Sequence, residues 1–250
     1  MIKVILLGAG NVAYHLAIAM EKSENIDFIQ RYRRSSHRDE LFPLDIPVTN
    51  DLDLLKEADI YLLAINDDSI KGFTEKFPDL NGLLVHTSGS APLTDLNPAN
   101  RRAVMYPLQT FTIDRLIDFS KISLALEAES ETDYILLEKF ARLLSLHVFN
   151  LNSEQRKQLH MAAVFANNFT NYMYLTAQEI CLENQIDFDV IKPLILETAE
   201  KIMDLDPIEA QTGPAKRQDD KILQEHLSLL TGEKKNIYQL LSKAISDRYK

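Results

Sequence analysis

Three polar side chains recur at helical spacing in a stretch of the chain that carries no formal charge. Residues 158–178 include His160, Asn167 and Asn171, seven and four positions apart, with Asn168 beside the second. On an α-helix these spacings place side chains on one face. A buried polar group left unpaired costs roughly 1–3 kcal/mol, so such a stripe needs partners. A bound ligand would supply them, and His160 could then protonate a carbonyl or imine, or orient it as the neutral ring.

The competing interpretation of this stripe is structural. The same side chains could bond to neighbouring helices or to loop carbonyls, and a single buried histidine is usually of this kind. The pattern therefore predicts catalytic candidates, His160, Asn167 and Asn168, and leaves the structural alternative open.

A second candidate follows a Gly-Pro turn. Gly213 and Pro214 indicate a fixed turn, and Arg217 comes three residues later, just before the expected start of a helix. Its guanidinium could bind a carboxylate or phosphate through two hydrogen bonds. Arg217 is therefore predicted as a fourth catalytic-site residue, one that would hold the substrate, and a solvated connection between two helices is the alternative.

The clearest chemical pattern lies at the N-terminus. An apolar run over 2–7 ends in Gly-Ala-Gly-Asn-Val-Ala over 8–13, and a helical pattern follows. This is the dinucleotide-binding fingerprint with alanine in its third position: the turn admits a pyrophosphate, and the amides that open the helix hold it. A purely structural glycine turn is the alternative. The predicted cofactor residues here are Gly8, Gly10, Asn11, Val12 and Ala13.

The end of the second expected strand indicates which dinucleotide would bind. NAD-specific domains carry an acid about 20 residues beyond the glycines. This chain has Arg33, Arg34, Ser35 and Ser36 there, with no acid before Asp39. Arginine and hydroxyl groups suit a 2′-phosphate, which a carboxylate would repel. The sequence therefore predicts NADP, against the alternative of a solvated basic loop.

Polar residues also follow the next two expected strands. Asn66 and Asp67 come after the fourth strand, and the fifth ends at His86, two residues before Ser88. Ligands of such sheets lie beyond the carboxyl ends of the strands. We expect Asn66, Asp67 and Ser88 to line the nicotinamide side, although Asp67 could instead cap a helix. His86 could bond to a loop or, as the alternative, transfer a proton.

The elements that position these residues alternate between strand and helix. Strands are expected over 2–7, 28–32, 46–49, 60–65, 83–86, 103–106, 122–126 and 147–149, with helices between them that include 14–22, 51–58 and 132–146. This alternation predicts an α/β fold, a doubly wound Rossmann-type domain.

The character of the chain changes near residue 151. No strand-like run follows Asn150, and Asn152 with Gln155 matches a capping box that opens a long helix. We therefore expect a dinucleotide-binding Rossmann domain over 1–151 and an all-α domain for substrate binding and dimerisation over 152–250.

Composition narrows the function classes. The net charge is −10, 46% of the 250 residues are apolar, and Cys181 is the one cysteine. This argues against disorder, a disulfide scaffold and a nucleic-acid binder. The uncharged stretch is too polar for an isolated membrane span. We expect a cytoplasmic protein with a small-molecule substrate, without a metal, a nucleic-acid partner or a membrane partner.

With these residues in view, the chain resembles a two-domain bacterial family that joins a Rossmann-like domain to a helical C-terminal domain of unknown function and is described as NADP oxidoreductases. The match rests on 8–13, 64–67, 86–89, 160–163 with Asn167 and Asn168, and 212–214 with Arg217 and Asp219. The family is similar to deazaflavin-dependent NADP oxidoreductases, pyrroline-carboxylate reductases and β-hydroxyacid dehydrogenases. The resemblance implies NADP in the first domain, a cleft between domains and a homodimer formed through the C-terminal helices.

One departure limits what the resemblance carries. The β-hydroxyacid enzymes have a catalytic lysine followed four residues later by asparagine, where this chain has His160 and Val164. Their mechanism therefore does not transfer. The prediction is an NADP-dependent oxidoreductase that moves hydride between nicotinamide and a small carbonyl or imine in the interdomain cleft. The alternative is a noncatalytic, NADP-binding, redox-sensing or regulatory dimer.

Overall fold

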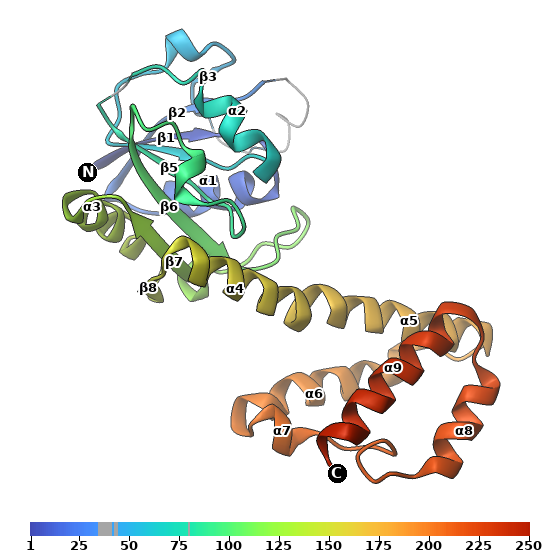
Figure 1. Cartoon of the computed structure of the whole chain (residues 1–250). Coiled ribbons are helices and arrows are strands. Elements are labelled where there is room, and N and C mark those ends of the chain that lie inside the picture. The colour runs from blue at the N-terminus through green and yellow to red at the C-terminus, as the bar shows by residue number, and fades with distance from the viewer. Residues whose placement is uncertain (35–41, 43–44, 80) are drawn as a thin grey trace. The chain divides into compact units, whose positions relative to one another are not determined.

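The structure, a computed structural model, describes residues 1–34, 42, 45–79 and 81–250 (Figure 1). Within them one sheet has the order β3-β2-β1-β4-β5-β6-β7-β8. Neighbouring strands are parallel except β6 and β7. The strands are β1 (Ile2–Leu7), β2 (Ile26–Tyr32), β3 (Val48–Thr49), β4 (Ile60–Leu63), β5 (Leu83–His86), β6 (Arg101–Leu108), β7 (Ser123–Ala128) and β8 (Val148–Asn150).

Helices join these strands and then continue alone to the end of the chain. They are α1 (Asn11–Glu21), α2 (Ile70–Thr74), α3 (Glu131–Arg142), α4 (Ser153–Ala163), a π-helix (Val164–Phe169), α5 (Thr170–Glu183), α6 (Lys192–Asp204), α7 (Pro207–Ala210), α8 (Asp220–Leu229) and α9 (Gly232–Arg248). A Rossmann-type α/β sheet followed by helices is the predicted fold class, which is confirmed.

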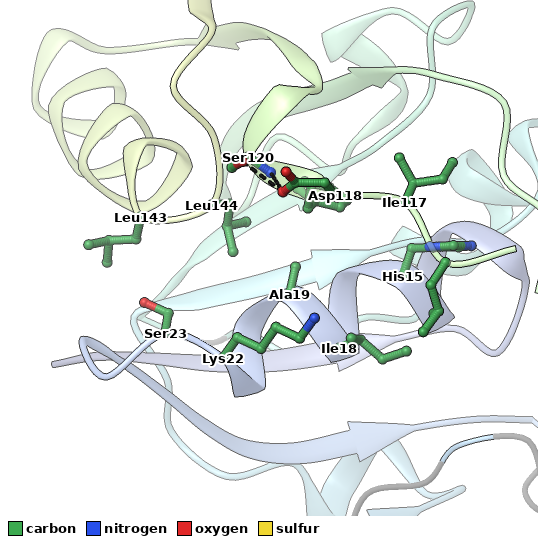
Figure 2. Close-up of a pocket in the computed structure, with 12 residues that line it drawn as sticks. His15, Ile18, Ala19, Lys22, Ser23, Ile117, Asp118, Ser120, Leu143 and Leu144 are labelled. Carbon is green, nitrogen blue, oxygen red and sulfur yellow. Dashed lines mark hydrogen bonds between the residues drawn. The ribbon is translucent and has the colours of Figure 1, made fainter.

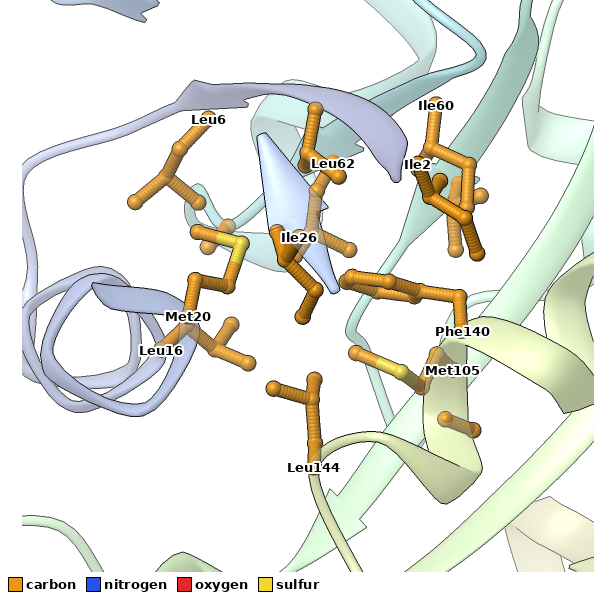
Figure 3. Close-up of a cluster of buried hydrophobic side chains, with 14 of the residues drawn as sticks. Ile2, Leu6, Leu16, Met20, Ile26, Ile60, Leu62, Met105, Phe140 and Leu144 are labelled. Atoms are coloured by element: carbon orange, nitrogen blue, oxygen red, sulfur yellow. The ribbon is translucent and has the colours of Figure 1, made fainter. Parts of the chain in front are cut away.

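Both faces of the sheet are covered, because alternate residues of each strand enter different cores. Leu6 and Leu62 lie in one core with Leu16 of α1 and Phe140 of α3, as Figure 3 shows. The neighbouring residues of the same strands point to the opposite face, where Leu63 packs in a second core with residues of α2 and its flanking segments. Burial on both faces explains why these strands are almost continuously apolar in sequence.

The chain forms two compact units, Met1–Asn168 and Phe169–Lys250. The strands end at Asn150, next to the predicted boundary at 151, and α4 belongs to the first compact unit. The roles predicted for 1–151 and 152–250 stay predictions. In the described part of the chain no helix has both the length and the apolar content of a membrane span.

Candidate functional site

The carboxyl ends of β1, β4, β5 and β6 meet at one edge of the sheet, because these strands run in parallel. At this edge Gly8 has φ +138°, and a Cβ added to it would lie 2.1 Å from the carbonyl oxygen of Ala64. Only glycine fits such a left-handed close approach without moving the backbone at the end of β4. The predicted tight turn therefore places β1 directly against the segment that leads to Asn66.

A hollow of about 260 Å³ opens beside this turn and is lined by Gly8, Ala9, Gly10, Tyr32, Arg33, Arg34, Ala64, Ile65, Asn66 and Phe73. The structure thus brings together the glycines, both arginines and Asn66, all predicted from sequence as cofactor residues. No carboxylate is among the described residues that line it. A positive hollow at a helix N-terminus suits a phosphate-bearing ligand.

The other residues of the glycine turn divide into two groups. Ala13 is fully buried in the core of the sheet, and Val12 packs against that core. The side-chain amide of Asn11 donates a hydrogen bond of 2.9 Å to the carbonyl of Phe111. Ligand contacts from this first turn would therefore come from backbone amides, which have no partner within the helix.

The arginine segment is only partly described. Arg33 is half-buried and Arg34 is exposed, and both line the hollow. Ser35 and Ser36, which were predicted to contact the same phosphate, lie outside the described residues.

Asp67 and Ser88 lie near the same edge but do not line this hollow. The hydroxyl of Ser90 donates a hydrogen bond of 2.5 Å to Oδ2 of Asp67. The buried hydroxyl of Ser88 accepts hydrogen bonds from the amides of Ser90, at 3.1 Å, and Ala91, at 2.9 Å. The hydroxyl of Ser88 thus stabilises the turn of the loop after β5. The carboxylate of Asp67 is bonded to the same loop through Ser90.

His86 is completely buried at the end of β5. Its Nδ1 accepts a 3.2 Å hydrogen bond from the amide of Ser88. Burial, followed by the charge of Arg156, lowers the pKa of His86 to about 3, against smaller opposing effects of the Pro92 carbonyl and Asp67. The imidazole is therefore neutral at physiological pH and has a structural place in the loop.

His160 meets Tyr106 above this loop. The hydroxyl of Tyr106 and Nδ1 of His160 are 3.0 Å apart, and the two rings pack edge to face. Gly89 lies against both: a Cβ added there would lie 2.7 Å from Nδ1 of His160 and 2.7 Å from Cζ of Tyr106. Glycine at 89 thus makes room for this pair.

Helix α4 carries His160, and its first two turns are firmly attached. Asn152 and Gln155 form the predicted capping box. One turn before His160, the guanidinium of Arg156 is 1% exposed, pairs with Glu127 of β7 and donates a 2.5 Å hydrogen bond to the carbonyl of Ala91. Both terminal nitrogens of this buried guanidinium are bonded, while its Nε has no partner among the described residues, and these bonds fix α4 one turn before His160.

The predicted shared face of His160, Asn167 and Asn171 is corrected by the structure. Residues Val164–Phe169 form a π-helix, whose wider i→i+5 turn changes the angle between successive side chains. The α-helical spacing therefore does not hold across it. Asn167 and Asn168 are both exposed, so they do not form a buried polar stripe within the described chain.

Arg217 belongs to the second compact unit, where its side chain is exposed in the segment before α8. The helix begins at Asp220 and is capped by Asp219, whose carboxylate accepts a 3.3 Å hydrogen bond from the amide of Ile222. In this unit another histidine, His226, has its Nδ1 2.8 Å from the hydroxyl of Tyr238.

Sequence reasoning missed Tyr106 and Arg156. Tyr106 ends the run expected as a strand over 103–106, so the rule that ligands bind at carboxyl ends could have selected it. Arg156 precedes His160 by one helical turn, yet an arginine in a polar helix start gives no sign that it is buried.

A separate hollow of about 220 Å³ runs along α1 and is lined by none of the predicted site residues. Figure 2 shows His15 and Lys22 on α1, with Ile117, Asp118 and Ser120 on the segment that lies across the hollow. Hydrogen bonds from Ser120 lower the pKa of Asp118, and the Nε2 atom of His15 is 3.0 Å from the carbonyl of Thr112. Among the described residues no group of three or more His, Cys, Asp or Glu side chains could hold a metal ion.

The parallel sheet, the glycine turn and the hollow at its carboxyl edge define a Rossmann-type protein. A solved protein of Bacteroides fragilis, provisionally named an NADP oxidoreductase, is 36% identical over 99% of this chain and 98% of its own, with a TM-score of 0.89. Residues 122–245 match the model of a domain of unknown function, DUF2520. The chain therefore belongs to the two-domain Rossmann-like family with this helical C-terminal domain.

More distant solved structures share the fold. The protein TM1727 of Thermotoga maritima is 22% identical, with a TM-score of 0.75, and covers 98% of each chain. An imine reductase of Myxococcus stipitatus in complex with NADP⁺ is 15% identical, with a TM-score of 0.68, and covers 98% of this chain and 92% of its own. No protein of curated function matches the chain in sequence.

Proposed function

We propose that this protein is an NADP-dependent oxidoreductase that acts on a small carbonyl or imine. The observation that carries the proposal is the hollow in which Gly10, Arg33 and Arg34 meet without a carboxylate among its described lining residues. A Cβ added to Gly10 would meet no atom of the described residues within 4 Å, so packing against them does not require glycine there. A pyrophosphate that approaches the backbone does require it. The 36% identical relative, named an NADP oxidoreductase, supports the same ligand.

The residues present fit NADP. The first-turn amides of α1 would bind the pyrophosphate, Arg33 and Arg34 the 2′-phosphate, and Asn66 the nicotinamide side. Bound NADPH would supply a hydride to the substrate carbon. His160 would hydrogen bond to the substrate oxygen or nitrogen, while Asn167, Asn168 and Arg217 stay candidates for further substrate contacts. The predicted cleft between the domains stays a prediction.

The 2′-phosphate assignment is tested with the double variant Arg33→Ala, Arg34→Ala. Loss of two charge-assisted contacts should weaken NADPH binding at least 50-fold, on the order of 2 kcal/mol, while NADH binding changes less than threefold. Calorimetric titration of both nucleotides measures this. Arg142→Ala, which removes an exposed arginine paired with Glu138, is the matched control. An equal loss for both nucleotides would contradict the assignment.

The oxidoreductase proposal is tested by NADPH oxidation against a panel of carbonyls, imines and a deazaflavin. Turnover of at least one class is expected. Tight NADPH binding with no oxidation of NADPH on any of them would favour a noncatalytic sensor instead.

We also propose that the C-terminal helices form a homodimer. Leu194, Met203, Leu229 and Leu240 are each at least 66% exposed in the single chain. A hollow of about 360 Å³ in the second unit is lined largely by apolar side chains of α5, α8 and α9. Exposed apolar side chains gathered on one unit are typical of a protein interface.

Sedimentation velocity tests the proposed dimer. The protein should sediment as a dimer at micromolar concentration, and Met203→Glu should shift it towards the monomer. Leu146→Glu, which alters an equally exposed leucine of the first unit, should leave the dimer intact. A monomer at all concentrations would overturn the proposal.

A further inference from the structure

Among the described residues, the hydroxyl of Tyr106 makes one hydrogen bond, and its partner is His160. Its hydroxyl lies 3.0 Å from Nδ1, the ring centroids are 5.8 Å apart, and the interplanar angle is 75°. Tyr106 is 8% exposed. Burial raises its pKa, and the carboxylate of Asp67 raises it further. The phenol therefore keeps its proton and can donate it to the imidazole.

The other ring nitrogen of His160 is free. Nε2 has no hydrogen-bond partner in the described parts of the chain, and it is not among the buried polar atoms that lack one, so it reaches solvent. With Nδ1 accepting from the phenol, the proton of the neutral ring lies on Nε2. Nδ1 is thus hydrogen-bonded to the protein, while Nε2–H is available as a donor.

The pair has little freedom to rearrange. A Cβ at Gly89 would lie within 2.8 Å of the Tyr106 ring and 2.7 Å from Nδ1 of His160, so the backbone of the loop after β5 packs closely against both rings. In addition, Arg156 fixes α4 one turn before His160 through Glu127 and the carbonyl of Ala91. The positions of both rings are therefore constrained by the protein itself.

We propose that Tyr106 is the positioning residue of this site: it holds His160 as the Nε2-protonated tautomer and directs Nε2–H to the acceptor atom of a C=O or C=N group. This rests on the proposed oxidoreductase function only for the identity of the acceptor. The pair itself can be examined in the protein without cofactor.

The primary test is ¹⁵N NMR of the histidine side chains in the cofactor-free protein. In the unmodified chain the neutral form of His160 should appear as one tautomer, protonated on Nε2. Tyr106→Phe removes only the hydroxyl and should convert this signal to a mixture of tautomers. Tyr238→Phe removes the hydroxyl bonded to His226 and should change the His226 signal alone. An unchanged His160 tautomer in a folded Tyr106→Phe protein would sink the proposal.

Kinetics give the second readout. Tyr106→Phe should lower kcat by about tenfold, the effect of one lost hydrogen bond, with the Kd of NADPH unchanged within twofold. Tyr238→Phe should leave both values unchanged. A loss confined to NADPH affinity would also overturn the assignment. Absence of turnover in the unmodified protein would refute the proposed function, while NMR would still decide the role of Tyr106.

Gly89→Ala provides an independent test if the Tyr106→Phe protein does not fold. Its methyl group should separate the two rings while both side chains remain. The same tautomer mixture is expected, and a His160 signal identical to that of the unmodified chain would show that the hydrogen bond does not set the tautomer.

Discussion

Two tyrosine–histidine pairs of nearly the same geometry occur in the two units of this chain. Tyr106 and His160 have a hydroxyl-to-Nδ1 distance of 3.0 Å, and Tyr238 and His226 one of 2.8 Å. Their ring centroids lie 5.8 and 5.7 Å apart, at 75° and 77°. In each pair a cation lies one helical turn before one member: Arg156 precedes His160, and Lys234 precedes Tyr238.

The surroundings of the pairs differ. Arg156 is 1% exposed and its carboxylate partner Glu127 is 15% exposed, whereas Lys234 pairs with Glu179 and with Glu183, which is 62% exposed. Tyr106 is buried, while His226 is exposed. Two side chains in the right geometry are therefore not enough to make a candidate site. The buried anchor and the position at the carboxyl edge of the sheet distinguish the first pair.

The largest effect is expected at the ion pairs next to the two tyrosine–histidine pairs, Arg156–Glu127 and Lys234–Glu183. Glu127→Gln removes the charge opposite a buried arginine, so the free energy of unfolding should fall by about 3 kcal/mol. The matched variant Glu183→Gln affects an exposed ion pair and should cost less than about 1 kcal/mol. Urea denaturation of both variants measures the difference. Equal losses would show that the buried and the exposed ion pair contribute equally to stability, which contradicts the difference argued above.

The next effect is expected in turnover. His160→Ala should lower kcat by about 100-fold, because positioned acid–base or hydrogen-bonding groups contribute this much, and NADPH affinity should be nearly unchanged. His226→Ala should change kcat less than twofold. Steady-state kinetics with calorimetric NADPH binding provides the check. Unchanged turnover in His160→Ala would remove this residue from the site.

The smallest effect concerns how the free energy of unfolding depends on pH through His86 in the first compact unit. Since the pKa of His86 is about 3 in the folded protein and 6.5 is its ordinary value, the unfolded chain binds a proton that the folded chain excludes. The contribution of His86 to stability is therefore complete above pH 6.5 and declines as the pH falls towards 3, by up to about 1.4 kcal/mol per pH unit.

Urea denaturation between pH 7 and pH 5 measures this decline. His86→Gln should lose this component of the pH dependence, with His226→Gln as the exposed control. An unchanged slope in His86→Gln would mean that other groups cause the acid sensitivity.

Much of the first unit could be predicted from the sequence because its signals are local. The apolar strands, the glycine turn at Gly8 and the capping box at Asn152 each depend on residues adjacent in the chain. The hollow that joins Gly10, Arg33 and Asn66 follows from the rule that parallel strands end at one edge.

Long-range contacts explain what could not be predicted. The helix expected over 51–58 is only a 3₁₀ turn, Leu52–Leu54, because Gln30 accepts from the amide of Lys56, and the Tyr61 hydroxyl bonds to the backbone at both Lys56 and Ala58. Similarly, no local pattern distinguishes the π-helix after Ala163 from an α-helix. Tyr106 and His160 are 54 residues apart, so only the fold reveals their contact.

The capping box at the start of α4 also sets a rotational phase. Asn152 fixes where the helix begins, and Ser153, Arg156 and His160 then follow at spacings of three and four, so all three face the sheet edge or its loops. Each residue turns an α-helix by about 100°. An insertion of one residue between Arg156 and His160 would leave the cap and the buried ion pair in place, yet it would swing the imidazole about a quarter turn away from Tyr106. The length of this short segment is therefore as much a determinant of the site as the identity of its residues.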